Sequence, residues 1–216
     1  MSDEKQKINR ASLYALLSYE QGKSLSESTA LKIKQVNVGK LSYIVSRDNR
    51  NIYIAFRGTD NTSNVITDLR FIPWYSKRFG WTHKGFLASF RKLKSELRST
   101  LNSFAGPGIN FIFVGHSLGG SICQMACIWA GSRYPEIKSS CISFGAPKVG
   151  LSSFGKKLKK YCHIRVFNPD DPVPMLPTSW FYNHYQTHVI KLEDNDNDWI
   201  DSNEHSMELY RKLLTE

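Results

Sequence analysis

The chain has 216 residues, of which 41% are hydrophobic, 12% aromatic and 22% charged, a composition that excludes disordered, collagen-like and coiled-coil proteins. The length predicts a single domain over residues 1–216. There are 29 Lys and Arg against 19 Asp and Glu, and the resulting formal charge of +10 suits an anionic partner such as nucleic acid or an acidic lipid surface.

The first half of the chain predicts a helix, a β-hairpin and a second helix. Leucines spaced as on one side of an amphipathic helix occur over residues 8–19. Two β-rich runs, 41–45 and 52–56, flank a polar turn and indicate the hairpin. From residue 85 to residue 104 apolar side chains recur at steps of three and four, which predicts the clearest helix of the chain.

The second half predicts short strands that alternate with helices. The run 111–114 is apolar without alternation, as expected for a strand buried on both faces. The later predicted elements are a helix over 118–134, strands at 141–144 and 162–167 with a lysine-rich helix between them, a strand at 185–192, and a closing helix marked by Met207, Tyr210, Leu213 and Leu214. Such alternation predicts the α/β class, with a mostly parallel central sheet and helices on both faces.

The four cysteines predict buried free thiols rather than a disulfide framework, because all of them lie in apolar stretches. Cys123 and Cys127 lie one helical turn apart, a spacing that a metal pair could use. No clear set of Cys or His nearby completes such a site, so neither a metal nor another cofactor is expected.

Residues 115–119, Gly-His-Ser-Leu-Gly, fit the Gly-x-Ser-x-Gly pattern of a nucleophile elbow. A buried strand is predicted immediately before this pattern and a helix immediately after it. In that setting Ser117 would stand in a sharp turn that lifts its hydroxyl above the sheet, and the glycines would allow the turn. The competing interpretation is a strand–helix turn that merely needs small residues. The flanking elements favour the nucleophile.

A serine nucleophile needs a histidine to take its proton and a carboxylate to orient that histidine. In folds with this elbow the acid and then the histidine follow the serine along the chain. Asp170 and Asp171 follow the strand predicted at 162–167, and the pattern does not choose between them. Three histidines come later: His184 in an aromatic loop, His188 inside a predicted strand, and His205 in a polar loop before the last helix.

Further motifs occur in chain order between about Ala55 and Tyr210. They are Ala55-Phe56-Arg57-Gly58-Thr59, Asn64-Val65-Ile66-Thr67-Asp68-Leu69, His83-Lys84-Gly85-Phe86, the elbow with its flanks (114–120), Phe144-Gly145-Ala146-Pro147-Lys148-Val149-Gly150, the segment 168–174 and His205-Ser206-Met207. Together they resemble the class 3 lipases, α/β-hydrolases that include the secreted fungal triacylglycerol lipases.

The resemblance implies a serine esterase or lipase that hydrolyses carboxylic esters of acylglycerols or related lipids. By this resemblance Ser117 is the nucleophile, Asp171 aligns with the acid because it stands just before a Pro-Val-Pro segment, and His205 aligns with the base. The backbone N–H groups of Thr59 and Leu118 would then form the oxyanion hole. A related alternative is an acyl hydrolase of the phospholipase A type.

An aromatic stretch lies between the predicted oxyanion loop and the helix at 85–104. Its residues Phe71, Trp74 and Tyr75, together with His184, are candidates for binding the acyl substrate or facing a lipid interface. Packing in the core is the competing interpretation for part of this stretch.

The basic charge leaves an interpretation from another class, a catalytically inactive module that binds lipid or nucleic acid. The lysines at 156, 157, 159 and 160 motivate it, but no nucleic-acid motif is present, so contact with a membrane surface is expected and nucleic acid is not. The start of the sequence lacks the pattern of a signal peptide and no apolar run approaches the length of a membrane span. We therefore predict a cytoplasmic location.

Overall fold

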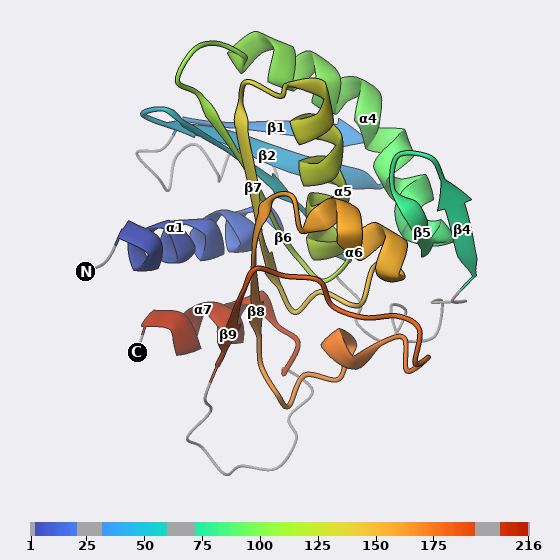
Figure 1. Cartoon of the computed structure of the whole chain (residues 1–216). Helices are drawn as coiled ribbons and strands as arrows, with labels where there is room; N and C mark the ends of the chain where they lie inside the picture. The colour runs from blue at the N-terminus through green and yellow to red at the C-terminus, as the bar shows by residue number, and fades with distance from the viewer. Residues whose placement is uncertain (1–2, 21–31, 60–71, 193–203, 216) are drawn as a thin grey trace.

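A seven-stranded sheet with the order β1-β2-β3-β6-β7-β8-β9 forms the centre of the computed structural model, which describes residues 3–20, 32–59, 72–192 and 204–215 (Figure 1). The strands are β1 (Ile33–Val38), β2 (Leu41–Asp48), β3 (Asn51–Phe56), β6 (Asn110–His116), β7 (Lys138–Phe144), β8 (Cys162–Phe167) and β9 (His188–Lys191). The pairs β1–β2 and β2–β3 are antiparallel, and all pairs from β3 to β9 are parallel. The predicted hairpin and the mostly parallel sheet are confirmed.

Helices cover both faces of this sheet, as predicted (Figure 1). One face carries α1 (Asp3–Leu17) and α7 (Met207–Thr215), which pack against each other. The other face carries α4 (Lys84–Phe104), α5 (Leu118–Arg133) and α6 (Ser152–Leu158). None of the helices in the described parts of the chain is long and apolar enough to cross a membrane.

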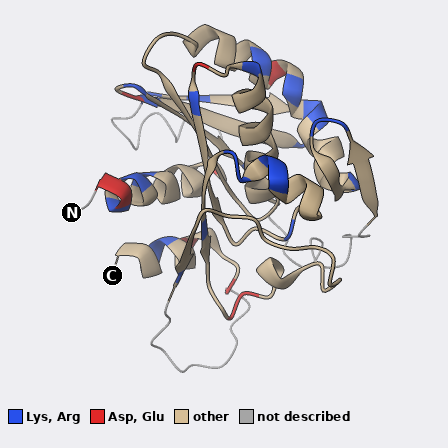
Figure 2. Ribbon diagram, in the orientation of Figure 1, with Lys and Arg blue, Asp and Glu red and all other residues tan. Residues whose placement is uncertain are grey.

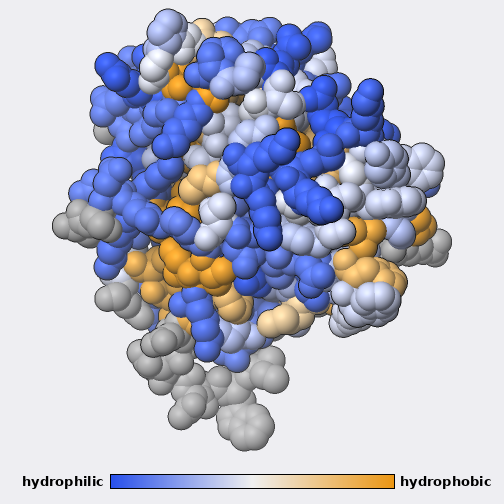
Figure 3. Space-filling model, in the orientation of Figure 1, coloured by the Kyte–Doolittle hydropathy of each residue, from blue (hydrophilic) through white to orange (hydrophobic). Residues whose placement is uncertain are grey.

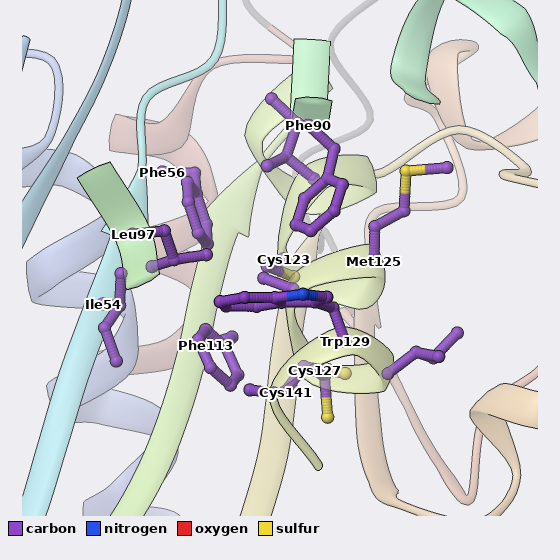
Figure 4. Close-up of a cluster of buried hydrophobic side chains, with 14 of the residues drawn as sticks. Ile54, Phe56, Phe90, Leu97, Phe113, Cys123, Met125, Cys127, Trp129 and Cys141 are labelled. Carbon is purple, nitrogen blue, oxygen red and sulfur yellow. The ribbon is translucent and has the colours of Figure 1, made fainter. Parts of the chain in front are cut away.

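The alternation of side chains along the strands builds a separate core on each face. In β3, Ile54 and Phe56 pack toward α4 and α5, whereas Tyr53 and Ala55 pack toward α1. In the larger core Trp129 of α5 lies among aromatic, aliphatic and sulfur-containing side chains (Figure 4). Because both faces are covered, the continuous apolar runs 52–56 of β3 and 111–114 of β6 are entirely buried.

All four cysteines are free, as the sequence predicts. Cys123, Cys127 and Cys141 are fully buried in the core between α5 and the sheet (Figure 4). Burial raises the pKa of the Cys127 and Cys141 thiols well above the ordinary value, so these side chains act as small apolar groups.

Four strands differ from the sequence-based expectation. The edge strand β1 was not expected, and its burial pattern shows why: every residue is half-buried or exposed, so no apolar alternation marks it. The aromatic stretch forms a separate antiparallel hairpin of β4 (Pro73–Ser76) and β5 (Gly80–His83). At the opposite edge of the sheet, β9 begins at His188 rather than at residue 185.

Candidate active site

Ser117 occupies a one-residue turn between the end of β6 and the start of α5. Its backbone has φ 56° and ψ −125°, a region that a residue with a side chain rarely adopts and that costs about 1–3 kcal/mol. The Ser117 N–H donates to the carbonyl oxygen of Phe144 at 3.0 Å, and this bond ties the turn to the end of β7. The predicted strand–turn–helix setting is therefore present, at the edge where the parallel strands end.

The glycines of the elbow are required by close backbone contacts. A Cβ at Gly115 would lie 2.2 Å from the carbonyl group of Gly119, and a Cβ at Gly119 would lie 2.1 Å from the carbonyl oxygen of Phe56. Both distances are far below van der Waals contact. Only glycine at these positions lets α5 fold back this tightly against β3 and β6.

Asp171 and His205 form a buried pair, although 34 residues separate them. His205 Nδ1 lies 2.6 Å from Asp171 Oδ2, and Asp171 Oδ1 accepts from the Val173 N–H at 2.9 Å. An ionised carboxylate only accepts, so the proton of the pair is on Nδ1 and the lone pair of the imidazole is on Nε2. Asp170, the alternative acid, is exposed, and its backbone N–H donates to the side chain of Asn168.

Two buried polar atoms of Ser117, Asp171 and His205 have no hydrogen-bond partner among the described residues. They are the Ser117 hydroxyl and His205 Nε2. Buried polar groups in proteins are nearly always paired, so an unpaired one needs an explanation. Transfer of a proton from a serine to a histidine uses this hydroxyl and this nitrogen, and both would be satisfied in contact with a reacting ester.

The loops that carry the acid and the histidine are locked together by side-chain hydrogen bonds. The Asn168 side-chain amide donates to Glu204 Oε2 at 2.6 Å. The Tyr210 hydroxyl donates to Asp171 Oδ2 at 2.7 Å and accepts from the Asn168 N–H at 3.1 Å. Tyr210 was expected only as an apolar residue of the closing helix, because nothing in the local sequence shows where its hydroxyl points.

His116 packs against the histidine of the pair. The two imidazole rings have centroids 4.5 Å apart, and His116 Nδ1 lies 2.7 Å from the Tyr19 hydroxyl. Burial lowers the pKa of His116 well below the ordinary value, and the neighbouring His205 lowers it further. A neutral His116 imidazole therefore lies against the His205 ring, a contact that the local sequence does not reveal.

Of the two expected oxyanion residues, one belongs to the elbow itself and the other to the loop after β3. Leu118 is the first residue of α5, so its N–H has no carbonyl group within the helix to bind, and it lies at the positive end of the helix dipole. Thr59 is exposed, three residues beyond β3. A Cβ on its neighbour Gly58 would lie 2.8 Å from the carbonyl oxygen of His116, so this loop packs directly against the elbow.

The alternative histidines lie apart from the Asp171–His205 pair. His184 Nε2 lies 2.7 Å from the carbonyl oxygen of Pro174, and because that oxygen only accepts, Nε2 carries the proton. Burial lowers the pKa of His184 to about 3, so its imidazole is neutral. His188 is exposed on β9, with Nδ1 3.3 Å from a carboxylate oxygen of Glu4.

The structure describes two of the three aromatic residues that the sequence suggests for substrate binding. Trp74 and Tyr75 are exposed on β4, at 47% and 56% of their surfaces, so they are not core residues. Trp81 on β5 is also exposed, and its ring lies 5.5 Å from that of Tyr75. Phe71 and the motif at 64–69 lie outside the described residues.

The fold is similar to that of a solved triacylglyceride lipase from Rhizomucor miehei. The superposition gives a TM-score of 0.78 at 25% sequence identity, and it covers 90% of this chain and 82% of that one. A lipase from Penicillium cyclopium, solved as an N225Q variant, superposes with a TM-score of 0.75 at 20% identity, covering 94% and 85% of the two chains. The α/β-hydrolase fold predicted from the resemblance is confirmed.

Sequence comparison leads to the same group of proteins. A Rhizomucor miehei lipase is 33% identical over 141 residues, covering 61% of this chain and 39% of the relative. The secreted mono- and diacylglycerol lipase 1 of Fusarium solani is 29% identical over 149 residues, covering 65% and 44%. The chain therefore spans about two fifths of the length of these curated relatives.

These relatives also correct one expectation. The absence of a signal-peptide pattern led to a predicted cytoplasmic location, whereas the similar proteins of Fusarium solani and Gibberella zeae are named as secreted lipases. The prediction of a cytoplasmic location is wrong. It relied on the absence of a signal-peptide pattern and of an apolar run long enough to span a membrane.

A family comparison covers the elbow and the acid together. The family described as Lipase (class 3) matches residues 53–181, which is more than half of the chain and runs from β3 past the loop that carries Asp171. With the fold, the elbow and the buried Asp171–His205 pair in place, this match is decisive: the chain belongs to the class 3 lipase family.

Proposed function

We propose that this protein is a serine carboxylic ester hydrolase that acts on acylglycerols or related lipids, with Ser117 as nucleophile, His205 as base and Asp171 as the orienting acid. The observation that carries the proposal is the 2.6 Å contact between His205 Nδ1 and Asp171 Oδ2. It leaves a buried Nε2 with a free lone pair, and the His205 ring contacts His116, the residue that precedes Ser117.

In the first half of the reaction, the Ser117 hydroxyl oxygen attacks the ester carbonyl carbon while His205 Nε2 takes the hydroxyl proton. The carbonyl oxygen becomes negative and is held by the N–H groups of Leu118 and Thr59, where each donor contributes about 3–4 kcal/mol to the transition state. The bond to the alcohol oxygen then breaks. His205 gives its proton to that oxygen, so the alcohol leaves neutral and an acyl-enzyme remains.

In the second half, a water molecule takes the place of the alcohol. His205 Nε2 removes a proton from the water, and the oxygen of the water attacks the acyl carbon. The bond to the Ser117 oxygen breaks and that oxygen recovers the proton, releasing the carboxylic acid. Throughout, Asp171 stabilises the transient imidazolium by accepting from Nδ1, and the Tyr210 hydroxyl shares the negative charge of the same carboxylate oxygen.

The substrate class rests on family membership and on the exposed apolar surface. The relatives named above include mono- and diacylglycerol lipases and a triacylglyceride lipase. Near the edge where the parallel strands end, the loop after β8 exposes Trp180 (84%) and Phe181 (46%), and the β4–β5 hairpin exposes Trp74. Tryptophan and phenylalanine at a surface favour contact with a lipid–water interface. We therefore propose peripheral contact with a lipid surface during turnover.

The inactive binding module fits the site less well. A fold that had lost catalysis would have no reason to retain a strained serine, a buried unpaired hydroxyl and a fully buried Asp–His pair, because each of these costs stability.

We also propose that residues 1–216 form one domain, since elements from both ends of the chain pack on the same sheet.

The decisive experiment compares Ser117→Ala with Ser121→Ala. Both serines are buried on or next to α5 with unpaired hydroxyls, so the second variant controls for loss of a buried hydroxyl. Ser117→Ala should lower hydrolysis of a chromogenic short-chain ester by about 10⁴-fold or more and should abolish labelling by a fluorophosphonate probe. Ser121→Ala should retain both. Labelling that survives in Ser117→Ala contradicts the assignment.

A panel of monoglyceride, triglyceride and phospholipid substrates then separates the lipase from the phospholipase A alternative. Wild-type protein should release fatty acid from the acylglycerols faster than from the phospholipid. The reverse order would assign the protein to the phospholipase A type.

A further inference from the structure

A cleft of about 470 Å³ lies on the face of the molecule covered by α5 and α6, away from the Asp171–His205 pair. Four cations line this cleft, and its lining contains no carboxylate. We call it the cationic cleft; its polar lining consists of Lys77, Arg78, Ser132, Lys157, Lys160 and Tyr161.

The cations come from two segments that are distant in sequence. Lys77 and Arg78 lie in the turn between β4 and β5, whereas Lys157 and Lys160 lie at the end of α6 and just beyond it. Figure 2 shows basic residues at both places, and the surface over α6 is strongly hydrophilic in the same view (Figure 3). The fold thus brings together four positive charges from two segments that are about 80 residues apart in the sequence.

The wall of the cleft is held in place on the side of α5. Arg78 Nη1 donates to the Ser132 hydroxyl, which itself donates to the carbonyl oxygen of Trp129 at 3.0 Å. This chain of bonds fixes the guanidinium while leaving its other N–H groups for a ligand. A fixed guanidinium loses less freedom on binding than a mobile side chain does.

The groups around the cleft match an anion that carries several acceptor oxygens. Lysine and arginine only donate, and Tyr161 adds a hydroxyl that can donate as well. Four like charges repel one another, and within the described part of the chain none of them has an ion pair with a carboxylate. A phosphate group relieves this repulsion, and guanidinium and ammonium groups are its usual partners.

The source of the phosphate is indicated by the neighbouring hairpin. The same two strands that position Lys77 and Arg78 expose Trp74, Tyr75 and Trp81 by 47%, 56% and 45%. Exposed tryptophan and tyrosine beside basic side chains are typical of protein surfaces at a lipid headgroup layer. A soluble phosphate compound needs no such apolar neighbours.

We propose that the cationic cleft binds the phosphate-bearing headgroup of an anionic lipid and thereby holds the enzyme on the surface that contains its substrate. The second part of this statement rests on the proposed function, whereas headgroup binding does not. The cleft is a site separate from the ester-cleaving machinery, since no lining residue belongs to the elbow, the acid loop or the histidine loop.

The test uses two double variants of the same segment. Lys157→Gln with Lys160→Gln removes two cations that line the cleft, and Lys156→Gln with Lys159→Gln removes two exposed cations that do not. Both double variants lower the formal charge by the same amount. Any difference in their partitioning onto vesicles is therefore due to the position of the lysines and not to net charge. Sedimentation with vesicles of phosphatidylcholine, with and without phosphatidic acid, measures partitioning at low salt.

Wild-type protein should partition more strongly onto the vesicles that contain phosphatidic acid. The cleft pair should lose about 10-fold or more of this partitioning, and the outer pair about 2-fold or less. Equal losses of partitioning in the two double variants would contradict a specific site, because they would indicate a general electrostatic attraction between the protein and the vesicle. The assignment of the phosphate to a lipid headgroup would be wrong if Lys157→Gln with Lys160→Gln weakened binding of inorganic phosphate or DNA while partitioning onto vesicles stayed unchanged.

Failure of this proposal is distinguishable from failure of the proposed function. Partitioning is measured on Ser117→Ala as well, where no hydrolysis alters the vesicles. Both double variants should hydrolyse a soluble short-chain ester as wild type does. Absent ester hydrolysis in wild type contradicts the proposed function and leaves headgroup binding to be judged by partitioning alone.

Discussion

The hydroxyl of Tyr210 and the imidazole of His205 donate to one and the same oxygen of Asp171, at 2.7 Å and 2.6 Å. Replacing Tyr210 with Phe should lower kcat/KM for a soluble ester by about 10-fold, the cost of one hydrogen bond to a charged group. The remaining negative charge should then favour the imidazolium more strongly. We therefore expect the pH at which activity is half-maximal to move upward.

Tyr14→Phe is the matched control for this substitution. Tyr14 is equally buried, but its hydroxyl donates to Ser46 of β2 and not to Asp171. This variant should lose stability without a change in the pH profile. If both tyrosine variants lowered activity with the same profile, the Tyr210 hydroxyl would serve the fold only.

Replacement of the histidines should separate the base from the neutral, structural histidine. His205→Ala should reduce ester turnover as severely as Ser117→Ala, and the combined variant should be little worse than either, because the two groups act as a unit. His184→Ala should retain most of the activity, since its Nε2 proton is engaged by Pro174. Steady-state kinetics on one short-chain ester checks all three variants. An inactive His184→Ala beside an active His205→Ala would reverse the assignment.

The tightness of the elbow predicts a strong dependence of stability on Gly119. An alanine there would place Cβ 2.1 Å from the carbonyl oxygen of Phe56, so β3 and α5 would have to separate. We expect Gly119→Ala to lower the free energy of unfolding in urea by about 3 kcal/mol. Gly106→Ala is the control, because a Cβ at Gly106 meets nothing within 4 Å. Similar midpoints for the two variants would contradict the packing described here.

Stability should fall in mild acid because of His163. Its Nδ1 donates to the carbonyl oxygen of Tyr185 at 3.0 Å, its Nε2 accepts from Ser143 at 2.8 Å, and burial lowers its pKa from 6.5 to about 4. Between these two pH values the unfolded chain binds a proton that the folded chain does not. The free energy of unfolding therefore decreases as pH falls from 6.5 to 4, by about 3 kcal/mol from this group.

Urea unfolding at several pH values measures this dependence. His163→Gln should be less stable at pH 7 and should show a smaller loss between pH 7 and pH 4. The control His188→Gln removes an exposed histidine and should leave the slope as in wild type. An unchanged slope in His163→Gln would show that this group does not control the acid dependence.

The residues proposed for chemistry could be predicted because each carries a local signal. Ser117 lies between glycines that follow an apolar strand, and Asp171 and His205 lie in motifs that resemble those of class 3 lipases. The choice of Asp171 over Asp170 came from that resemblance alone. In the structure the two side chains differ in burial, a property that depends on the whole fold and that the short segment does not encode.

The supporting contacts could not be predicted, because they join segments that are far apart in sequence. The Tyr210 hydroxyl and the His116 ring belong to the candidate site only through their positions against Asp171 and His205. The β4–β5 hairpin escaped prediction for a different reason. Its strands are four residues long, β4 is largely exposed, and the buried residues of β5 are Gly80, Thr82 and His83, so apolar alternation does not mark them.

The packing of α1 against α7 has a kinetic consequence. Arg211 of α7 donates to the Ser12 hydroxyl of α1 at 3.2 Å, although 199 residues separate them. α7 begins two residues after His205, so the proposed base is secured only when opposite ends of the chain have met. Contacts of such long range form slowly, because the intervening chain must be ordered first. During refolding, burial of Trp129 within the central core should be complete while esterase activity is still rising, and the final step of folding would then be the one that creates the enzyme.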